Sequence, residues 1–568
     1  MRWISNEQKE PQKAQALAQA LAVSLPIAQL LVQRGIDTYE SAKAFFRPHW
    51  GQLHDPYLMK DMEKAVARIL LALSVEESIM IYGDYDVDGT TSVALVSSFL
   101  KTLSNKIITY IPDRYSEGYG VSYQGIDYAA SQGIGLIIAL DCGIKAIDKI
   151  AYAKEKGIDF IVCDHHRPGA ELPKAAAILN PKQQECSYPY KELCGCGVGF
   201  KLLQALAIKL DINEQELVPY LDLVATAIGA DIVALDGENR TLAALGLKQL
   251  NSSPRAGFKA IIEQLELQEL SLTNVIYSIA PRINAAGRMN HGSQAVAFLV
   301  ETDLFNAREL AKRIDQNNSD RRAVESQITQ EALDQIISDQ EEASASTVVY
   351  APHWHKGVIG IVASRLIETY YRPTIVFTKS GELLTASARS IKGFDLYRAI
   401  DSCKEHLVQF GGHTAAAGIT LKETHYPKFK KAFDSYVKAH VSEELKTPAT
   451  TIDLCIELRD ITPKFYRILQ QFAPFGPSNW APNFLSKQVQ DSGYAKTVGE
   501  EGNHLKAHFK QEDAYGIDAI GFGLGNKLEL ITGRKKVDVV YAIDHNTWQG
   551  NTKLQLKLKD LRPAETEN

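Results

Sequence analysis

At 568 residues, with 45% hydrophobic and 23% charged side chains, the chain is too long for one hydrophobic core, and about three or four globular domains are expected. The net charge of −6 argues against a sequence-independent duplex binder, although it leaves room for a local basic channel. Seven cysteines without a C-x-x-C pair exclude a disulfide framework and predict reduced thiols.

The N-terminal residues 1–75 form the first predicted unit, a helical region with a packing role. Leu21, Leu25 and Leu30 recur at near-helical spacing, and Pro26 is typical of a first helical turn. The start of the chain lacks the apolar segment of a secretion signal, and no long uncharged apolar run follows. We therefore expect a cytoplasmic protein that does not span a membrane.

From about residue 78 to 235, strand-like and helix-like segments alternate. Strands are predicted at 78–82, 107–111, 136–140 and 160–163. These runs are apolar on both faces, which is typical of a parallel sheet covered by helices. Each run ends in polar residues, and ligands of such sheets bind beyond the carboxyl ends of the strands. The sequence therefore predicts one shared site at this edge.

The first of these strands is followed by Asp84, Asp86 and Asp88 within five residues. Carboxylates this close repel each other, and a hard divalent cation such as Mg²⁺, Mn²⁺ or Ca²⁺ would offset the repulsion. An EF-hand also begins D-x-D-x-D-G, but Leu95 stands where its bidentate Glu belongs, and the preceding segment is strand-like. A solvated acidic turn is the remaining alternative.

The fourth strand is followed by Asp164, His165 and His166. Adjacent histidines on an extended backbone point to opposite sides, so one can bind a metal while the other faces a substrate. Together with the acidic stretch and Asp141, they predict a metal centre. Mixed carboxylate and imidazole ligands favour Mn²⁺ over Ca²⁺.

The glycines of residues 195–199 lack the G-x-G-x-x-G spacing of a dinucleotide site and indicate a helix-opening turn.

A helix pattern at about 305–340 would span roughly 50 Å and connect two domains. A second α/β block begins with a strand at 347–350, and short strands beyond about 450 predict a small OB-like β-barrel. The predicted α/β architecture is thus a helical region 1–75, a parallel-sheet domain 76–304, a connecting helix 305–342, a second α/β domain 343–446 and a barrel domain 447–568.

The acidic stretch, Asp141 and Asp164-His165-His166 resemble the first three motifs of the DHH phosphoesterase superfamily. The stretch 222–233 resembles its fourth motif, and 410–418 resembles the signature of its DHHA1 domain. Further stretches are similar to the RecJ family of single-strand-specific 5′→3′ DNA exonucleases; they are 281–289, 354–363 and 387–391. The similarity runs from about residue 20 to 420 and is weaker beyond.

The resemblance implies a centre of two divalent cations, Mn²⁺ or Mg²⁺. The implied metal ligands are Asp86, Asp88, Asp141, His165 and Asp231, and the implied catalytic residues are Asp84 beside them and His166 on the substrate side. Asp222 is the alternative to Asp231, which is preferred because it ends an apolar run. Tyr82 stands where other superfamily members have a histidine, so no histidine ligand is expected there.

The resemblance also implies a substrate-binding set. A 5′-phosphate pocket is expected from Arg114, Ser387 and Arg389, whose donors match phosphate oxygens. Gly411, Gly412 and His413 would let the backbone approach a phosphate, and Arg282 and Arg288 would either contact the strand or brace the domain. Stacking platforms in the barrel are expected among Phe472, Phe475, Trp480 and Phe484.

The implied function is metal-dependent hydrolysis of single-stranded DNA from its 5′ end to 5′-mononucleotides, in DNA repair and recombination. A single-strand-binding protein and a helicase are the implied protein partners. One alternative is a DHH-family phosphodiesterase for short oligonucleotides or cyclic dinucleotides, against which the extra C-terminal domain argues. Another is an inactive DNA-binding scaffold, against which the full set of acids and histidines argues.

Overall fold

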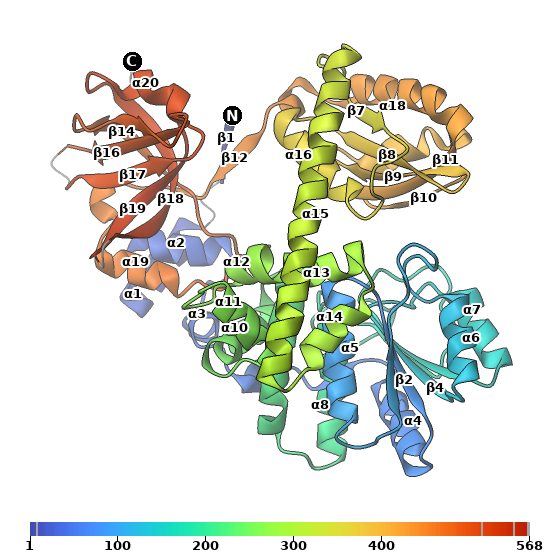
Figure 1. The fold of residues 1–568 in the computed structure, drawn as a ribbon. Helices are drawn as coiled ribbons and strands as arrows, with labels where there is room; N and C mark the ends of the chain where they lie inside the picture. Colours follow the sequence, from blue (N-terminus) through green and yellow to red (C-terminus); the bar gives the residue numbers. More distant parts are fainter. Residues whose placement is uncertain (7–9, 513–514, 549–550, 565–568) are drawn as a thin grey trace.

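The computed structural model describes residues 1–6, 10–512, 515–548 and 551–564 (Figure 1). Three larger sheets, of five, five and seven strands, are arranged around one long helix, α15 (Leu304–Ser338). Within these described ranges, no helix combines the length and the apolar composition needed to cross a lipid bilayer.

The first sheet is parallel, as predicted, with strand order β3-β2-β4-β5-β6. Its strands are β2 (Ile79–Gly83), β3 (Ile107–Tyr110), β4 (Leu136–Leu140), β5 (Asp159–Cys163) and β6 (Ala177–Leu179). The chain moves from β2 to β3 on one side and then crosses to β4 on the other. The carboxyl ends of β2 and β4 therefore flank the point at which the winding reverses, where ligands bind in such folds.

Alternate residues of β2 enter two different cores, which explains why the strand reads as apolar throughout. Ile79 and Ile81 pack in a core with α5 (Val87–Leu100) and α8 (Gly195–Lys209). Met80 and Tyr82 pack in a core with α6 (Tyr123–Ser131) and α7 (Ile147–Glu155). Helices thus cover both faces, and only the strand ends are left for chemistry.

Further helices extend this domain toward α15. They are α9 (Leu221–Asp231), α10 (Gly237–Ser252), α11 (Ala256–Gln264), α12 (Leu272–Asn274), a π-helical turn (Val275–Ile279), α13 (Ala280–Met289) and α14 (Ser293–Val300). Their apolar faces belong to the same core as α5 and α8.

The connecting helix α15 is one uninterrupted element of 35 residues, close to the predicted range. Near its start, Ala311 and Ile314 pack in the core of the first domain. Near its end, Ala332 and Ile336 pack against the second domain. One helix therefore contributes to two cores, and Figure 1 shows it running from one domain to the other.

The second domain has a mixed sheet with strand order β10-β11-β9-β8-β7. Its strands are β7 (Thr347–Tyr350), β8 (Thr374–Ser380), β9 (Leu383–Arg389), β10 (Gln409–Gly412) and β11 (Ala416–Lys422). One face packs against α16 (Ile359–Thr369) and α15, and the other against α17 (Leu396–Asp401) and α18 (Tyr426–His440).

The C-terminal domain is a seven-stranded sheet with order β13-β14-β18-β19-β17-β16-β15, closed by a further pairing between β14 and β16. Its strands are β13 (Leu454–Cys455), β14 (Phe484–Asp491), β15 (Lys496–Val498), β16 (His504–Lys510), β17 (Ile517–Gly521), β18 (Lys536–Trp548) and β19 (Asn551–Pro563), with helices α19 (Pro463–Gln470) and α20 (Leu528–Ile531). The predicted barrel is therefore present.

The stacking platforms expected in this barrel are partly wrong. Phe472 and Phe484 are completely buried in its core, because aromatic side chains at such spacing fill the interior of a small barrel. Phe475 packs partly against the same core. Of the four predicted aromatics, only Trp480 is largely exposed.

Residues 1–75 do not form a purely helical unit of their own. The chain begins with a strand, β1 (Arg2–Ser5), which pairs in parallel with β12 (Ala449–Ile452) at the entrance to the barrel domain. Helices α1 (Pro11–Leu21), α2 (Leu25–Gln33) and α3 (Tyr39–Phe46) pack in the barrel core, whereas α4 (Met62–Ser74) packs in the parallel-sheet domain. The helical spacing of the leucines identified helices but not the domain that each one covers.

Candidate metal centre

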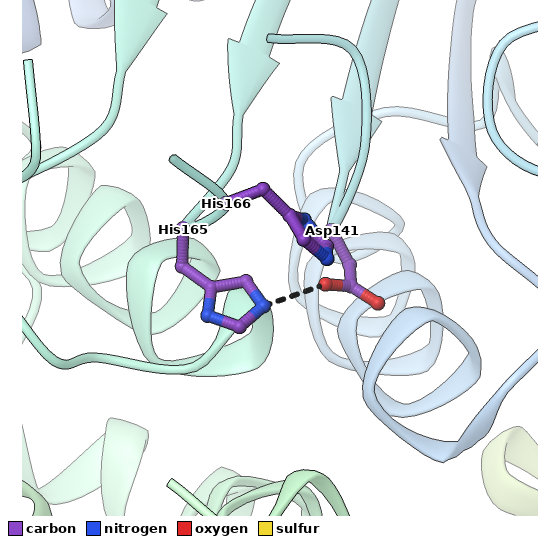
Figure 2. Close-up of side chains that lie close together, drawn as sticks. All are labelled: Asp141, His165 and His166. Atoms are coloured by element: carbon purple, nitrogen blue, oxygen red, sulfur yellow. Dashed lines mark ion pairs between the residues drawn. The ribbon is translucent and has the colours of Figure 1, made fainter. Parts of the chain in front are cut away.

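Four side chains from four separate elements meet beyond the carboxyl edge of the parallel sheet. Asp88 follows β2, Asp141 follows β4, His165 follows β5, and Asp231 ends α9. The Nε2 atom of His165 lies 3.2 Å from Asp141 Oδ1, 3.6 Å from Asp231 Oδ2 and 3.7 Å from Asp88 Oδ2. Figure 2 shows the His165 ring directed at Asp141.

These side chains form two overlapping sets of potential metal ligands. One set consists of Asp141, His165 and His166, and the other of Asp88, His165 and Asp231. Within each set, one ligand atom per residue lies within 4.8 Å of the others. His165 is common to both sets.

The electrostatics of the group favour a bound cation. Burial raises the pKa of Asp88, and the nearby Asp86 raises it further, to about 7. Burial, with the charges of Asp88 and Asp86, raises the pKa of Asp141 and of Asp231 well above the ordinary range. Carboxyl groups crowded in this way stay ionised only if positive charge compensates them.

His165 is prepared as a neutral ligand. Burial and the neighbouring His166 lower the pKa of its imidazole to about 3. Neither ring nitrogen of His165 has a hydrogen-bond partner among the described residues, and the same holds for Oδ1 of Asp141. A neutral imidazole and a carboxylate thus present unsatisfied buried acceptors 3.2 Å apart, and Mn²⁺ or Mg²⁺ would satisfy both.

Asp88 is held in place by the N-terminus of α8. Its Oδ2 accepts a hydrogen bond from the backbone N–H of Gly195 at 2.6 Å, and its Oδ1 accepts one from Cys196 at 2.7 Å. A Cβ at position 195 would lie 2.6 Å from the Cβ of Asp141, so only glycine fits there. The predicted helix-opening turn is confirmed. The sequence did not indicate that its backbone N–H groups of Gly195 and Cys196 hold the Asp88 carboxylate, an arrangement we call the cradle.

Asp164 orients the second histidine. Its Oδ1 accepts hydrogen bonds from the backbone N–H of His165 at 2.7 Å and of His166 at 3.0 Å, and it lies 2.7 Å from His166 Nδ1. Burial alone would raise the pKa of Asp164, but the bonds from His166 lower it to about 2. Burial likewise would lower the pKa of His166, and the carboxylate of Asp164 raises it to about 9.

The two histidines do not point to opposite sides, because the extended backbone that this would require ends before them. Their ring centroids lie 4.5 Å apart, and both rings join the metal-ligand sets. The reason is that β5 ends at Cys163, so the turn built on Asp164 replaces an extended backbone. Nε2 of His166 is then left to face Tyr119, whose hydroxyl lies 3.3 Å away.

Two further acids of the predicted site lie beside the two sets. Asp84 is completely buried, its Oδ1 accepts from the backbone N–H of Gly120 at 3.2 Å, and its Oδ2 has no partner among the described residues. Asp86 caps α5, with Oδ1 accepting from Gly89 N–H at 3.0 Å. Tyr82 is buried and donates its hydroxyl proton to the Gly120 carbonyl, so it offers no ligand to the group.

The structure distinguishes the two candidates in the fourth motif. Asp222 is completely buried and forms an ion pair with Arg255 at 2.9 Å. Asp231 instead lies against His165. Asp231 was preferred because it ends an apolar run, as the other predicted ligands do. That run is the helix α9, whereas the runs before the other ligands are strands.

The predicted phosphate-binding residues lie on both domains. The Arg114 guanidinium lies 4.2 Å above the ring of Tyr85 in the first domain. On β9 of the second domain, Arg389 Nη1 donates to Ser387 Oγ at 3.0 Å. Burial lowers the pKa of Arg389, which indicates a partly desolvated cation.

The predicted glycines extend from Ser387 across the sheet. Gly418 on β11 pairs with Ser387, and Gly411 on β10 pairs with Gly418. No described atom lies within 4 Å of the point where a Cβ of Gly411 or Gly418 would stand, so this row of the sheet is open. Gly412 and the exposed His413 form the adjoining turn. Gly418 ends the stretch 410–418 singled out in the sequence, but it was not among the predicted site residues.

The two other arginines brace the structure. Arg282 forms an ion pair with Asp315 of α15 at 2.7 Å and donates to the Ser278 carbonyl at 2.6 Å. Arg288 donates from Nη1 to the Gly357 carbonyl of the second domain at 2.9 Å. Burial, followed by the charges of Arg114 and other arginines, lowers the pKa of Arg288 to about 9.

Comparisons with known proteins agree with this architecture. Three family models match the chain: the DHH family N-terminal domain over residues 78–228, the DHHA1 domain over 344–439 and the RecJ OB domain over 452–560. The single-stranded-DNA-specific exonuclease RecJ of Bacillus subtilis is 38% identical over the whole of this chain and 71% of its own length. That of Salmonella typhimurium is 33% identical, over 94% of this chain and 96% of the relative.

The chain belongs to the RecJ family. Among solved structures, RecJ of Thermus thermophilus in complex with Mn²⁺ superposes with a TM-score of 0.86 at 26% identity, covering all of this chain and 80% of that one. An exonuclease RecJ bound to manganese matches 69% of this chain and 97% of its own, with a TM-score of 0.60 and 30% identity. Members of the RecJ family with this fold therefore hold manganese.

Proposed function

We propose that this chain is a metal-dependent 5′→3′ exonuclease that hydrolyses single-stranded DNA to 5′-mononucleotides, in DNA repair and recombination. One observation carries the proposal: the buried carboxylates of Asp88 and Asp141 and the partly exposed carboxylate of Asp231 surround one neutral imidazole, His165, beyond the carboxyl edge of the sheet. Relatives that match 94% and 100% of this chain are named single-stranded-DNA-specific exonucleases.

We infer that Asp88, Asp141, His165 and Asp231 hold two Mn²⁺ or Mg²⁺ ions, with Asp86 beside them. The unsatisfied acceptors of Asp141 and His165 fit this role. Such cations, when bound, polarise a phosphodiester and a water molecule for in-line hydrolysis. Asp88 cannot turn away from them, because two backbone N–H groups fix its carboxylate.

His166 and Asp84 are the proposed catalytic residues. The Asp164 carboxylate keeps a proton on Nδ1 of His166, which leaves Nε2 facing the Tyr119 hydroxyl. In this position Nε2 can donate a hydrogen bond to a phosphate oxygen as negative charge develops. The free Oδ2 of buried Asp84 can accept a hydrogen bond or proton from a nearby water.

Recognition of the 5′ end is assigned to groups from both domains. Arg114 and Arg389 supply forked cationic donors, and Ser387 supplies a hydroxyl for a terminal phosphate. The open row from Ser387 through Gly418 to Gly411 lets a sugar-phosphate backbone approach the sheet. Because a strand-separating helicase and a single-strand-binding protein generate and cover single strands, we also propose these as partners.

The test is degradation of a single strand labelled at its 3′ end and phosphorylated at its 5′ end, with Mn²⁺ present. A 5′→3′ enzyme shortens the labelled strand one nucleotide at a time, and the released products are 5′-mononucleotides. A strand labelled at its 5′ end should release its label as a mononucleotide at the first step. Cleavage confined to di- and trinucleotides or cyclic dinucleotides would overturn the proposal, and binding without cleavage would indicate a scaffold.

A further inference from the structure

The loop between β3 and α6 places two adjacent side chains in different directions. Oδ1 of Asp113 accepts hydrogen bonds from the backbone N–H of Tyr115 at 3.0 Å and of Ser116 at 2.8 Å, which fixes the loop. Arg114 turns toward Tyr85 of the first domain. Tyr115 turns instead toward the second domain.

Tyr115 takes part in a contact that joins the two domains. Its hydroxyl donates to the backbone carbonyl of Arg288. The same Arg288 donates from Nη1 to the carbonyl of Gly357, at 2.9 Å. The ring of Tyr115 also meets the ring of His355 edge-on, with centroids 5.9 Å apart. We call Tyr115, Arg288, His355 and Gly357 the junction latch.

The junction latch leaves no room for a side chain at Gly357. A Cβ at this position would lie 2.7 Å from the Tyr115 hydroxyl oxygen and 2.7 Å from the Arg288 carbonyl oxygen. Three residues later, a Cβ at Gly360 would lie 2.9 Å from Ser387 Oγ and 3.0 Å from Arg389 Nη2. The segment 357–360 therefore touches the latch at one end and the phosphate-binding pair at the other.

The junction latch is thus next in sequence or space to the three side chains proposed to bind the 5′-phosphate. Arg114 immediately precedes Tyr115, and Ser387 and Arg389 rest on the start of α16, which follows Gly357. The metal-ligand sets lie wholly in the first domain. None of the residues in these two sets belongs to the latch.

We propose that Tyr115 and Gly357 are positioning residues that set the specificity for a 5′-phosphorylated end, by holding Arg114 at a fixed separation from Ser387 and Arg389. This inference rests on the proposed function and identifies the contacts that tune it. Forked donors bind a phosphate well only at a matching separation. Loosening the latch therefore weakens end binding and spares the chemical step.

The experiment compares Tyr115→Phe with the unaltered chain on single strands that carry a 5′-phosphate or a 5′-hydroxyl, with Mn²⁺ present. One hydrogen bond is lost, so KM for the phosphorylated strand should rise about fivefold, and the preference in kcat/KM should fall by the same factor. kcat should stay within about twofold. Gly357→Ala should have a larger effect of the same kind.

Tyr123→Phe is the matched control, since Tyr123 is an exposed tyrosine of α6 whose ring packs on Tyr152. It should leave KM, kcat and the phosphate preference unchanged. The melting temperature of Tyr115→Phe should stay within a few degrees of the unaltered chain. If Gly357→Ala does not fold, Tyr115→Phe carries the test alone.

Two failures are distinguishable. If the unaltered chain degrades single strands but shows no preference for a 5′-phosphate, the proposed end recognition is wrong and the latch inference falls with it. If the preference exists and Arg389→Ala abolishes it while Tyr115→Phe retains it, only the latch inference is overturned. A fall in kcat with an unchanged phosphate preference overturns it as well.

Discussion

At the scale of single residues, His165 and Asp141 explain why the acidic group needs a cation. Their facing atoms are buried, lie 3.2 Å apart and lack hydrogen-bond partners among the described residues. Burial keeps the imidazole neutral, with a pKa of about 3, so protonation of His165 cannot balance the carboxylates at neutral pH. The group is therefore electrostatically strained until metal binds.

Divalent cations are expected to stabilise the folded chain. Mn²⁺ at 100 times its dissociation constant should add about 2.7 kcal/mol to the free energy of unfolding and raise the melting temperature. Asp141→Asn removes one repelling charge, so without cation this variant should melt no lower than the unaltered chain. Its response to Mn²⁺ should be much smaller. Thermal unfolding with and without Mn²⁺ measures both, and an equal Mn²⁺ response in the variant would contradict the ligand assignment.

The cradle at the start of α8 gives a second prediction. Gly195→Ala brings a methyl group within 2.6 Å of the Asp141 Cβ and disturbs the N–H groups that hold Asp88, so affinity for Mn²⁺ should fall about 10- to 100-fold. Gly197→Ala is the control on the same helix, because its methyl group would meet its nearest neighbour at 3.4 Å, an ordinary contact. Calorimetric titration with Mn²⁺ measures both, and equal affinities in the two variants would show that the cradle is not needed.

At the scale of elements, the polar centre of α15 separates its two apolar ends. Arg321 and Glu325 are buried there and form an ion pair one helical turn apart. Oε1 of Glu325 also accepts from Arg365 of α16 at 2.8 Å, and Arg321 Nη2 donates to Asn318 Oδ1 at 2.8 Å. The ion pair allows this arginine to be buried where the helix passes from the first domain to the second.

Removal of Glu325 should be costly. Glu325→Ala leaves Arg321 buried without its carboxylate, so the free energy of unfolding should fall by about 3–5 kcal/mol. Asp334→Ala, on the exposed face of the same helix, should change it by less than about 0.5 kcal/mol. Urea unfolding measures the free energy of unfolding of both variants. Similar decreases in the two would show that the buried ion pair does not stabilise the fold.

The success of predicting the structure from the sequence differs between local elements and the contacts that join them. The strands of the parallel sheet and the long helix were predictable, because apolar runs and helical spacing report local structure. Contacts between distant segments were not. The pairing of β1 with β12, the packing of α1 in the barrel, and the ion pair of Asp222 with Arg255 depend on which surfaces meet. In the site, side-chain chemistry identified Asp141 and His165, whereas the backbone donors of Gly195 and Cys196 carry no side-chain signature.

At the scale of the whole molecule, Arg240 of α10 joins three parts of the chain. It donates to the carbonyls of Phe472 at 2.8 Å, Ala473 at 3.0 Å and Phe45 at 3.2 Å. Its guanidinium also stacks 3.6 Å from the Phe45 ring centroid. The parallel-sheet domain, the N-terminal helices and the entrance to the barrel are therefore held by one side chain.

Arg240→Ala should loosen the barrel from the rest of the protein. We expect limited proteolysis of the segment near residues 470–480 to be at least about tenfold faster, since loss of about 1.4 kcal/mol or more raises the open population by that factor. Lys248→Ala, an exposed position on the same helix, is the control. Equal cleavage rates in the two variants would show that other contacts suffice to hold the barrel.

The continuity of α15 has a mechanical consequence. A helix without interruption resists bending. The two domains that share it therefore cannot open by a hinge motion to admit an internal segment of a polynucleotide. The strand must therefore enter with its end first, one nucleotide after another. A covalently closed circle offers no terminus, and it should remain intact however long it is incubated with active protein and manganese.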